Sequence, residues 1–234
     1  MQQKIRFVSD LKNQRLLIAG VVALFFFILV AALVVSRVTQ SIDSSLALKL
    51  NMGLGSEFTT LMLIVSNYGR EYFWTGVVAL MLIFGKKQMK IFALELAVLL
   101  IAGALIGEGL KLLISRNRPY EDLSRIVLRA PADTDSSFPS GHALIVSIGA
   151  VFVLTKFKKK IVAVLLTIEA VVVCYSRIYL GLHYPMDILG GVFAGATIVF
   201  IGLFVLENYF PKGIDLAGKW FQKCFELLHI PELF

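Results

Sequence analysis

Residues able to bind and cleave a phosphate group are concentrated between Lys111 and Asp187. Two of the three histidines of the 234-residue chain lie in this stretch, together with separated cations and a Ser-Gly turn. They form three groups, in chain order Lys111 with Arg118-Pro119, then Pro139-Ser140-Gly141-His142, then Ser176-Arg177 with His183 and Asp187. Cations, free backbone N–H groups and imidazoles in one set favour a bound phosphate.

The Pro139-Ser140-Gly141-His142 segment has the composition of a helix start. Serine is a favoured N-cap, and glycine lets the backbone approach a ligand closely. The free N–H groups and the positive dipole end of such a helix bind anions. Considered alone, the tetrapeptide is better explained as an ordinary helix cap, and no Gly-x-Ser-x-Gly motif marks a serine nucleophile.

Lys111, Arg118 and Arg177 supply positive charge to the same set. Arginine offers planar paired donors to phosphate oxygens, and lysine adds a compact charge. Taken singly, each resembles a cation at a membrane surface, the commoner fate at a helix end. Beside a helix N-terminus, the three together would neutralise the charge on a phosphoryl group during transfer.

His183 and Asp187 are spaced so that the carboxylate can hold one imidazole nitrogen. This contact fixes the tautomer and leaves the other nitrogen free to attack phosphorus. His142 would then protonate the departing oxygen as a general acid. A lone histidine near a membrane surface is more often a packed or solvated residue, so this interpretation depends on the three groups meeting in space.

The composition indicates an integral membrane protein. Apolar residues make up 58% of the chain and charged residues 17%, and the mean hydropathy is +0.81, more apolar than a water-soluble domain of this size requires. The net charge of +7 is scattered between apolar segments rather than gathered on a stripe, which fits helix flanks and excludes nucleic acid as the expected partner. Cys174 and Cys224 match no metal spacing and are expected to pack.

Hydropathy predicts an all-α membrane protein with six transmembrane helices in a single domain, residues 1–234. Residues 1–15 are expected to be a cytoplasmic tail, 16–210 the six-helix bundle and 211–234 an amphipathic C-terminal helix at the membrane. The first segment is too long, and lacks the small residues, for a cleaved signal peptide. The expected spans are residues 16–35, 69–85, 91–110, 139–155, 161–175 and 186–206.

Polar residues interrupt this pattern at a few positions. Residues 41–66 carry leucines at helical spacing between charges, which predicts an interfacial amphipathic helix, or alternatively a loop and a packing helix. Glu95 and Glu108 are expected to have structural roles, with Glu108 placed to pair with Lys111 three residues on. Glu169 has no evident partner in the sequence.

An even number of spans places both termini on one side of the cell membrane. Lysine and arginine are more abundant in the tails and in the connections on that side, so the positive-inside rule predicts that both termini are cytoplasmic. Traced through this topology, all three polar groups lie at the extracytoplasmic face. This coincidence predicts one composite active site there.

The three groups resemble the signature motifs of the type 2 phosphatidic acid phosphatases, the PAP2 superfamily, at every motif position. The resemblance extends over roughly residues 46–206 and implies a six-helix membrane fold and a metal-free lipid phosphatase without a cofactor. It implies that His183 is the nucleophile and forms a phosphohistidine, that Asp187 orients it, and that His142 acts first as acid and then as base. By the same resemblance, the phosphate would be held by Lys111, Arg118, Ser140, Gly141 and Arg177.

The substrate implied is a membrane lipid phosphate, whose headgroup meets the site while its tail stays in the bilayer. Bacterial members of the family act on such lipids, and undecaprenyl pyrophosphate or phosphatidylglycerophosphate is expected here. Vanadium haloperoxidases share the motifs but are soluble. A lipid phosphotransferase would use the same phosphohistidine with another acceptor. A transporter of anionic solutes is less favoured, because it would place polar residues near the membrane midplane.

Overall fold

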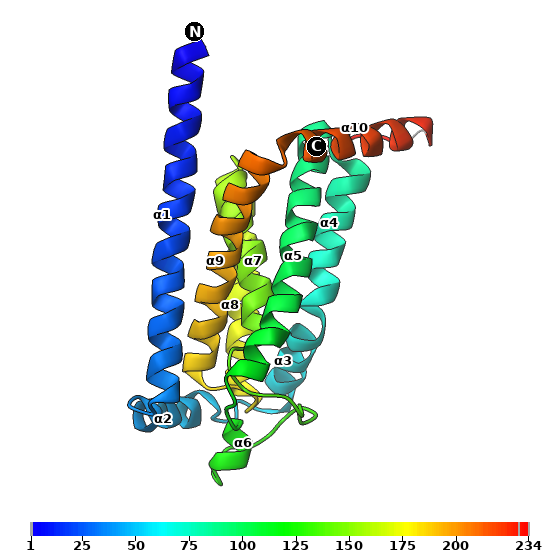
Figure 1. The fold of residues 1–234 in the computed structure, drawn as a ribbon. Helices are drawn as coiled ribbons and strands as arrows, with labels where there is room; N and C mark the ends of the chain where they lie inside the picture. Colours follow the sequence, from blue (N-terminus) through cyan, green and yellow to red (C-terminus); the bar gives the residue numbers. More distant parts are fainter. Residues whose placement is uncertain (1, 229, 234) are drawn as a thin grey trace.

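The structure, a computed structural model, describes residues 2–228 and 230–233, and these residues form helices joined by loops (Figure 1). This confirms the all-α prediction for the described part of the chain. The helices in chain order are α1 (Gln2–Val35), α2 (Gln40–Leu50), α3 (Ser56–Tyr68), α4 (Glu71–Phe84), α5 (Lys87–Leu113), α6 (Pro119–Asp122), α7 (Gly141–Lys156), α8 (Lys160–Tyr179), α9 (Pro185–Tyr209) and α10 (Pro211–Leu227).

Helix α7 forms the centre of the bundle. It packs against α5, α8 and α9, and α1 packs on the outer side of α9. The side chains of α7 from Ala143 to Ala150 are all buried, including Leu144 and Ile148, which belong to the main hydrophobic core. The helix that begins at the Ser-Gly turn is therefore the one most firmly fixed by packing.

Small residues allow α9 to approach α7 closely at the end where α7 begins. A Cβ atom on Gly191 would lie 2.6 Å from the carbonyl oxygen of Ser140, and one on Gly195 would lie 2.6 Å from that of Leu144. No side chain fits at those separations, so the glycines set the distance between the two helices.

The described helices include four that are long and apolar enough to cross a membrane: Leu11–Val35 within α1, Lys87–Leu113, Lys160–Tyr179 and Pro185–Tyr209. Helices α4 and α7 are apolar but shorter, with 14 and 16 residues. At 1.5 Å per residue they reach about 21 and 24 Å, less than a hydrocarbon core of about 30 Å. Six spans therefore stay a prediction. It requires the two shorter helices, α4 and α7, to cross the membrane together with the four long ones.

The segment 41–66, expected to form one interfacial helix or a loop and a packing helix, contains two helices separated by a loop. Helix α2 ends at Leu50, and α3 begins at Ser56 after Gly55, whose φ of +94° favours glycine. The side chain of Asn51 donates hydrogen bonds to the carbonyl oxygens of Val127 and Tyr179, at 3.0 and 2.8 Å. These contacts anchor the chain where the helix would otherwise continue. At the N-terminus, α1 begins at Gln2, so the helix extends through residues that were predicted to be a tail, 1–15.

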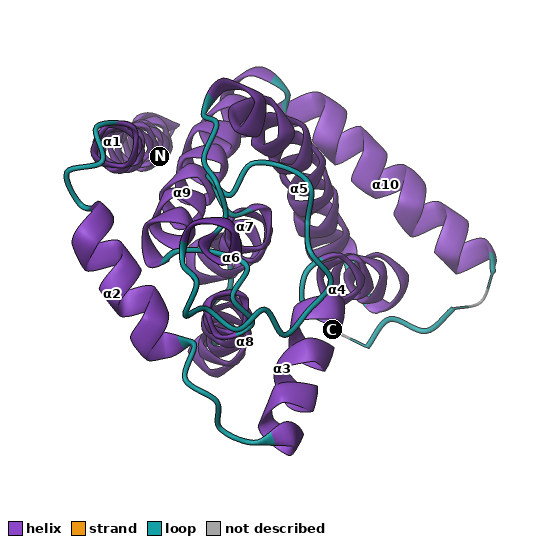
Figure 2. Cartoon of the chain, turned by 90° about the horizontal axis from the view of Figure 1, so that it is seen from below, coloured by secondary structure: helices purple, strands orange, loops and turns teal. Residues whose placement is uncertain are grey.

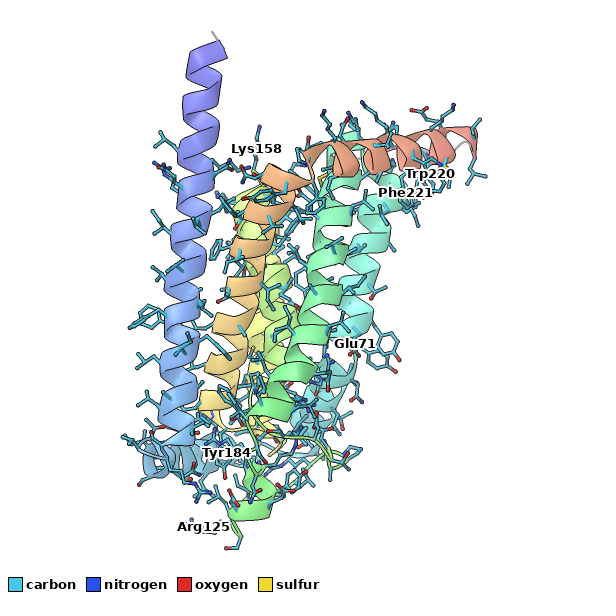
Figure 3. All side chains as sticks on the ribbon, viewed as in Figure 1. Glu71, Arg125, Lys158, Tyr184, Trp220 and Phe221 are labelled. Carbon is cyan, nitrogen blue, oxygen red and sulfur yellow. The ribbon has the colours of Figure 1, made fainter. Side chains whose placement is uncertain are left out.

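The two ends of the bundle differ in structure. Helices α2 and α6 lie at one end, with Tyr184 and Arg125, whereas α10 lies across the other end, with Lys158, Trp220 and Phe221 (Figures 1 and 3). At that second end Lys156 pairs with Glu95 at 2.6 Å and with Glu207 at 2.7 Å, joining α5, α7 and α9. Glu95 thus has the structural role predicted for it.

Candidate active site

The end of the bundle that carries α2 and α6 contains a cavity of about 400 Å³. Figure 2 views this end directly, with the loop between α5 and α7 lying over the bundle. The cavity wall includes both histidines and four further members of the predicted site, namely Lys111, Arg118, Gly141, His142, Arg177 and His183. Residues from three separate parts of the sequence therefore meet, as predicted. Ser140 and Asp187 are fully buried behind the cavity wall.

His183 lies in the loop between α8 and α9 and is buried. Its Nδ1 is 3.4 Å from Oγ of Ser137 and 3.6 Å from Oδ2 of Asp187, and its Nε2 is 3.4 Å from Nη1 of Arg118. Burial, and then the positive charges of Arg177, Arg118 and Lys111, hold the pKa of His183 well below its ordinary value. The imidazole is therefore neutral at pH 7 and has a lone pair available as a nucleophile.

Asp187 is held by three donors rather than by the imidazole directly. Its Oδ2 accepts hydrogen bonds from Oγ of Ser137 at 2.5 Å and from the backbone N–H of Tyr184 at 2.8 Å. Its Oδ1 accepts from Nη1 of Arg116 at 2.5 Å. Ser137 thus contacts both the carboxylate and Nδ1 of His183, and was not recognised from the sequence because it lies outside the matched motif positions.

Arg116 connects this carboxylate to α2. Its Nη2 donates to Oδ2 of Asp43 at 2.6 Å, and its guanidinium lies over the ring of Tyr184, 4.1 Å from the centroid. Asp43 also accepts from the backbone N–H of Met186, at 3.0 Å, near the start of α9. Neither residue was predicted. Arg116 stands two positions before Arg118, but no local pattern identifies Asp43 as its partner.

The start of α7 forms another part of the wall. Oγ of Ser140 accepts a hydrogen bond from the backbone N–H of Ala143 at 3.4 Å, which confirms that Ser140 is the N-cap. The backbone N–H of Ser140 donates to the carbonyl oxygen of Asp187 at 3.0 Å. Gly141 and His142 open the helix at the cavity, where backbone N–H groups and the helix dipole favour an anion.

Aspartates from the loop between α5 and α7 occupy the cationic part of the cavity. Lys111 pairs with Asp135. Arg118 is 2.5 Å from Asp135 and 3.0 Å from Asp133. Arg177 is 2.8 Å from Asp133 and also donates to Oγ of Ser66 at 2.7 Å. All three predicted phosphate-binding cations thus contact carboxylate oxygens, which resemble phosphate oxygens in charge and geometry.

The electrostatics of Asp135 reflect these pairings. Partial burial alone would raise its pKa, but hydrogen bonds and charges from Lys111 and Arg118 outweigh burial and lower the pKa to about 2.

The predicted pair between Glu108 and Lys111 is wrong, because Lys111 forms its ion pair with Asp135 instead. Glu108 lines the same cavity. In residues 2–228 and 230–233, no group of three or more His, Cys, Asp or Glu side chains is placed to hold a metal ion.

Comparisons with known proteins agree with this arrangement. A family model described as the PAP2 superfamily matches residues 92–210. The chain is 43% identical over 143 residues to an undecaprenyl-diphosphatase of Sulfolobus acidocaldarius, covering 61% of this chain and 68% of that one. It is 28% identical over 217 residues to phosphatidylglycerophosphatase B of Bacillus subtilis, covering 86% and 98%.

The fold also matches a solved structure. The crystal structure of a transmembrane PAP2-type phosphatidylglycerolphosphate phosphatase from Bacillus subtilis superposes with a TM-score of 0.65 at 24% identity, covering 81% of this chain and 96% of that one. The likeness supports a helical membrane fold for this chain. Because the family model spans more than half of the sequence and includes all three polar groups, the chain belongs to the PAP2 superfamily.

Proposed function

We propose that this chain hydrolyses the phosphate or diphosphate of a membrane lipid through a phosphohistidine formed on His183, without a metal ion. The observation that carries the proposal is that both histidines line one cavity with Lys111, Arg118 and Arg177. Family membership supports a lipid phosphatase, since the relatives are named as phosphatases of lipid phosphates. Undecaprenyl diphosphate and phosphatidylglycerophosphate are the substrates that these names favour.

In the first step, a neutral nitrogen of His183 forms a bond to phosphorus while the bond from phosphorus to the leaving oxygen breaks. His142, in its imidazolium form, gives a proton to that oxygen and becomes neutral, and the lipid product leaves. In the second step His142 accepts a proton from water, which attacks phosphorus and breaks the P–N bond. Inorganic phosphate is released, and His183 is neutral again.

The surroundings lower the barrier for both steps. The three cations and the N–H groups at the start of α7 stabilise charge on the non-bridging oxygens. Asp187 is a positioning residue that acts through Ser137 and the backbone of Tyr184. A phosphate that enters must displace Asp133 and Asp135 from the cations, so binding exchanges one set of charged contacts for another.

We further propose that the cavity opens at the extracytoplasmic face of a multi-pass membrane protein. Apolar helices and membrane relatives support the membrane location. The beginning of α1 and the whole of α10 lie at the end of the bundle away from α2 and α6 (Figure 1). With both termini cytoplasmic, as the distribution of positive charge predicts, the cavity faces outward.

The test is phosphate release by the purified full-length chain in detergent from a panel of lipid phosphates and diphosphates, with EDTA present. We expect turnover without added metal, a ³²P label on the protein that is acid-labile and alkali-stable, and the loss of both in His183→Ala. Lys158→Ala, at the opposite end of the bundle (Figure 3), is the control. Turnover by His183→Ala, or a strict need for Mg²⁺, would contradict the mechanism. Transfer of label to an added alcohol in place of water would identify a phosphotransferase.

A further inference from the structure

A fourth cation, Arg70, lies in the wall of the same cavity and belongs to none of the three motifs. It occupies the turn between α3 and α4, directly before Glu71. A Cβ atom placed on Gly141 would be 3.6 Å from Nη1 of Arg70 and 3.8 Å from Nζ of Lys111. Arg70 and Lys111 therefore both approach the start of α7.

Arg70 differs from the other cations in its partners. Lys111, Arg118 and Arg177 are each paired with an aspartate of the loop between α5 and α7. The ion pair of Arg70 is with its neighbour Glu71, at 2.8 Å, and 64% of that side chain is exposed, on the flank of the bundle (Figure 3). Water screens such a pair.

The guanidinium of Arg70 also has a donor without a protein partner. Its Nε is buried and makes no hydrogen bond within the described residues. A buried charged donor beside a cavity, without an acceptor, carries a desolvation cost that an anionic ligand would offset. Arg177 also has a buried Nε without a hydrogen bond among the described residues, but it is paired with Asp133, and Lys111 and Arg118 are paired with Asp135. Arg70 has no such pair with a loop aspartate, so its position indicates a second anionic group.

The in-line geometry of the proposed reaction indicates where this second anion would bind. His183 attacks phosphorus from one side, so the leaving oxygen lies on the opposite side, where His142 protonates it. Arg70 approaches Gly141, the residue next to His142 in the chain, and therefore lies near the proposed acid. A lipid diphosphate carries a second phosphate at this position, whereas a lipid monophosphate carries only the carbon of an alcohol.

We propose that Arg70 binds the second phosphate of a lipid diphosphate, and that the site therefore prefers diphosphates to monophosphates. In the reaction, Arg70 would stabilise the negative charge that develops on the departing lipid monophosphate. The proposal rests on the proposed phosphatase function and names the substrate class for the same site. It assigns Arg70 to specificity and leaves the attack on phosphorus to His183.

The test compares farnesyl diphosphate with farnesyl monophosphate, two substrates that share a tail and differ by one phosphate. We expect the ratio of kcat/KM for diphosphate to that for monophosphate to fall about 10- to 100-fold in Arg70→Gln, the effect of one charge-assisted hydrogen bond. Arg70→Lys should recover part of the ratio. Arg125→Gln, an exposed arginine at the same end of the bundle, should leave the ratio unchanged.

Equal losses on both substrates, or no loss on either, would overturn the assignment of Arg70. An inactive wild-type protein would by itself contradict the proposed function. A second measurement, of binding, tests the role of Arg70 in that case as well. In the His183→Ala background, calorimetry should show that Arg70→Gln weakens binding of inorganic pyrophosphate about tenfold or more, with a smaller effect on inorganic phosphate. Equal effects on the two anions would overturn the role of Arg70 even without turnover.

Discussion

Arg116 donates a 2.5 Å hydrogen bond from Nη1 to Oδ1 of Asp187, a residue 71 positions away in the chain. The same guanidinium bonds to Asp43 of α2, so three segments are joined at Arg116, and the carboxylate of Asp187 is fully buried. The orientation of Asp187, and through Ser137 that of His183, thus depends on a residue outside the cavity wall. Arg116 is a positioning residue for the proposed nucleophile.

Replacing Arg116 by alanine should lower kcat about 10- to 100-fold, the usual cost of losing a residue that orients a catalytic group. KM should change little, because Arg116 does not line the cavity. Arg116→Lys should recover part of kcat, and Arg125→Ala should behave as wild type. Steady-state kinetics with a lipid diphosphate measure these effects. A change confined to KM would assign Arg116 to substrate binding instead.

Replacing Asp135 by asparagine should strengthen substrate binding. The change removes a carboxylate that pairs with both Lys111 and Arg118, so an incoming phosphate meets less competition. We expect KM to fall about 3- to 10-fold, the scale of one weakened ion pair. Asp122→Asn removes the same charge from the end of α6 without freeing a cation of the site, and is the matched control. A rise in KM would show that Asp135 assists binding.

Stability should depend on pH through His183. Its pKa is low in the folded chain because of burial and nearby cations, and ordinary, about 6.5, in the unfolded chain. Below pH 6.5 only the unfolded state gains the proton, so the free energy of unfolding falls by up to about 1.4 kcal/mol per pH unit and is fully restored above that pH.

Thermal unfolding in detergent at pH 7.5 and 5.0 measures this dependence. His183→Gln cannot take up the proton and should lose less of its Tm between the two values than wild type does. His142→Gln gives a second comparison from the same cavity. If Tm fell by the same amount between pH 7.5 and 5.0 in His183→Gln and in wild type, the buried imidazole would have to be protonated in the folded chain.

Replacing Glu169 by leucine should stabilise the fold. Within the described residues, neither of its buried carboxylate oxygens makes a hydrogen bond of ordinary geometry, and the same holds for the buried indole N–H of Trp74. Removing an unsatisfied buried polar group relieves a cost of about 1–3 kcal/mol. A higher Tm with unchanged phosphate release is the expected result. Loss of activity would instead indicate a functional role for this carboxylate.

Membrane orientation is testable with single cysteines in a Cys174→Ala, Cys224→Ser background. Arg125→Cys should react with an impermeant thiol reagent on intact cells, and Lys158→Cys only after lysis, because the two positions lie at opposite ends of the bundle (Figure 3). The proportion of labelled protein, measured by mass shift, gives the result. The reverse pattern would place the cavity at the cytoplasmic face.

The sequence predicted the elements of the fold better than the contacts between them. Apolar segments located the long helices, and their alternating direction brought Lys111, Arg177 and His183 to one end. The break between α2 and α3 was not predictable, because Asn51 is anchored by a loop and a helix end far along the chain.

Within the site, motif residues were predictable because the chemistry requires those residue types at fixed spacing. Their partners were not, since Asp43, Asp133 and Asp135 are acidic residues in loops or on an exposed helix, where solvated charge is the ordinary expectation. Arg70 lies in the turn between two helices, where a solvated cation is equally ordinary. Three-dimensional proximity alone distinguishes these residues from other surface charges.

The aspartates that neutralise the cations are attached to the same chain, so they are present at a fixed local concentration at all times. In a phosphatase this tether affects the last step of the cycle. In the proposed mechanism, phosphate freed by cleavage of the P–N bond has no tail to retain it and would compete with Asp133 and Asp135 for the same cations. These carboxylates would therefore favour release of the product and weaken inhibition by inorganic phosphate.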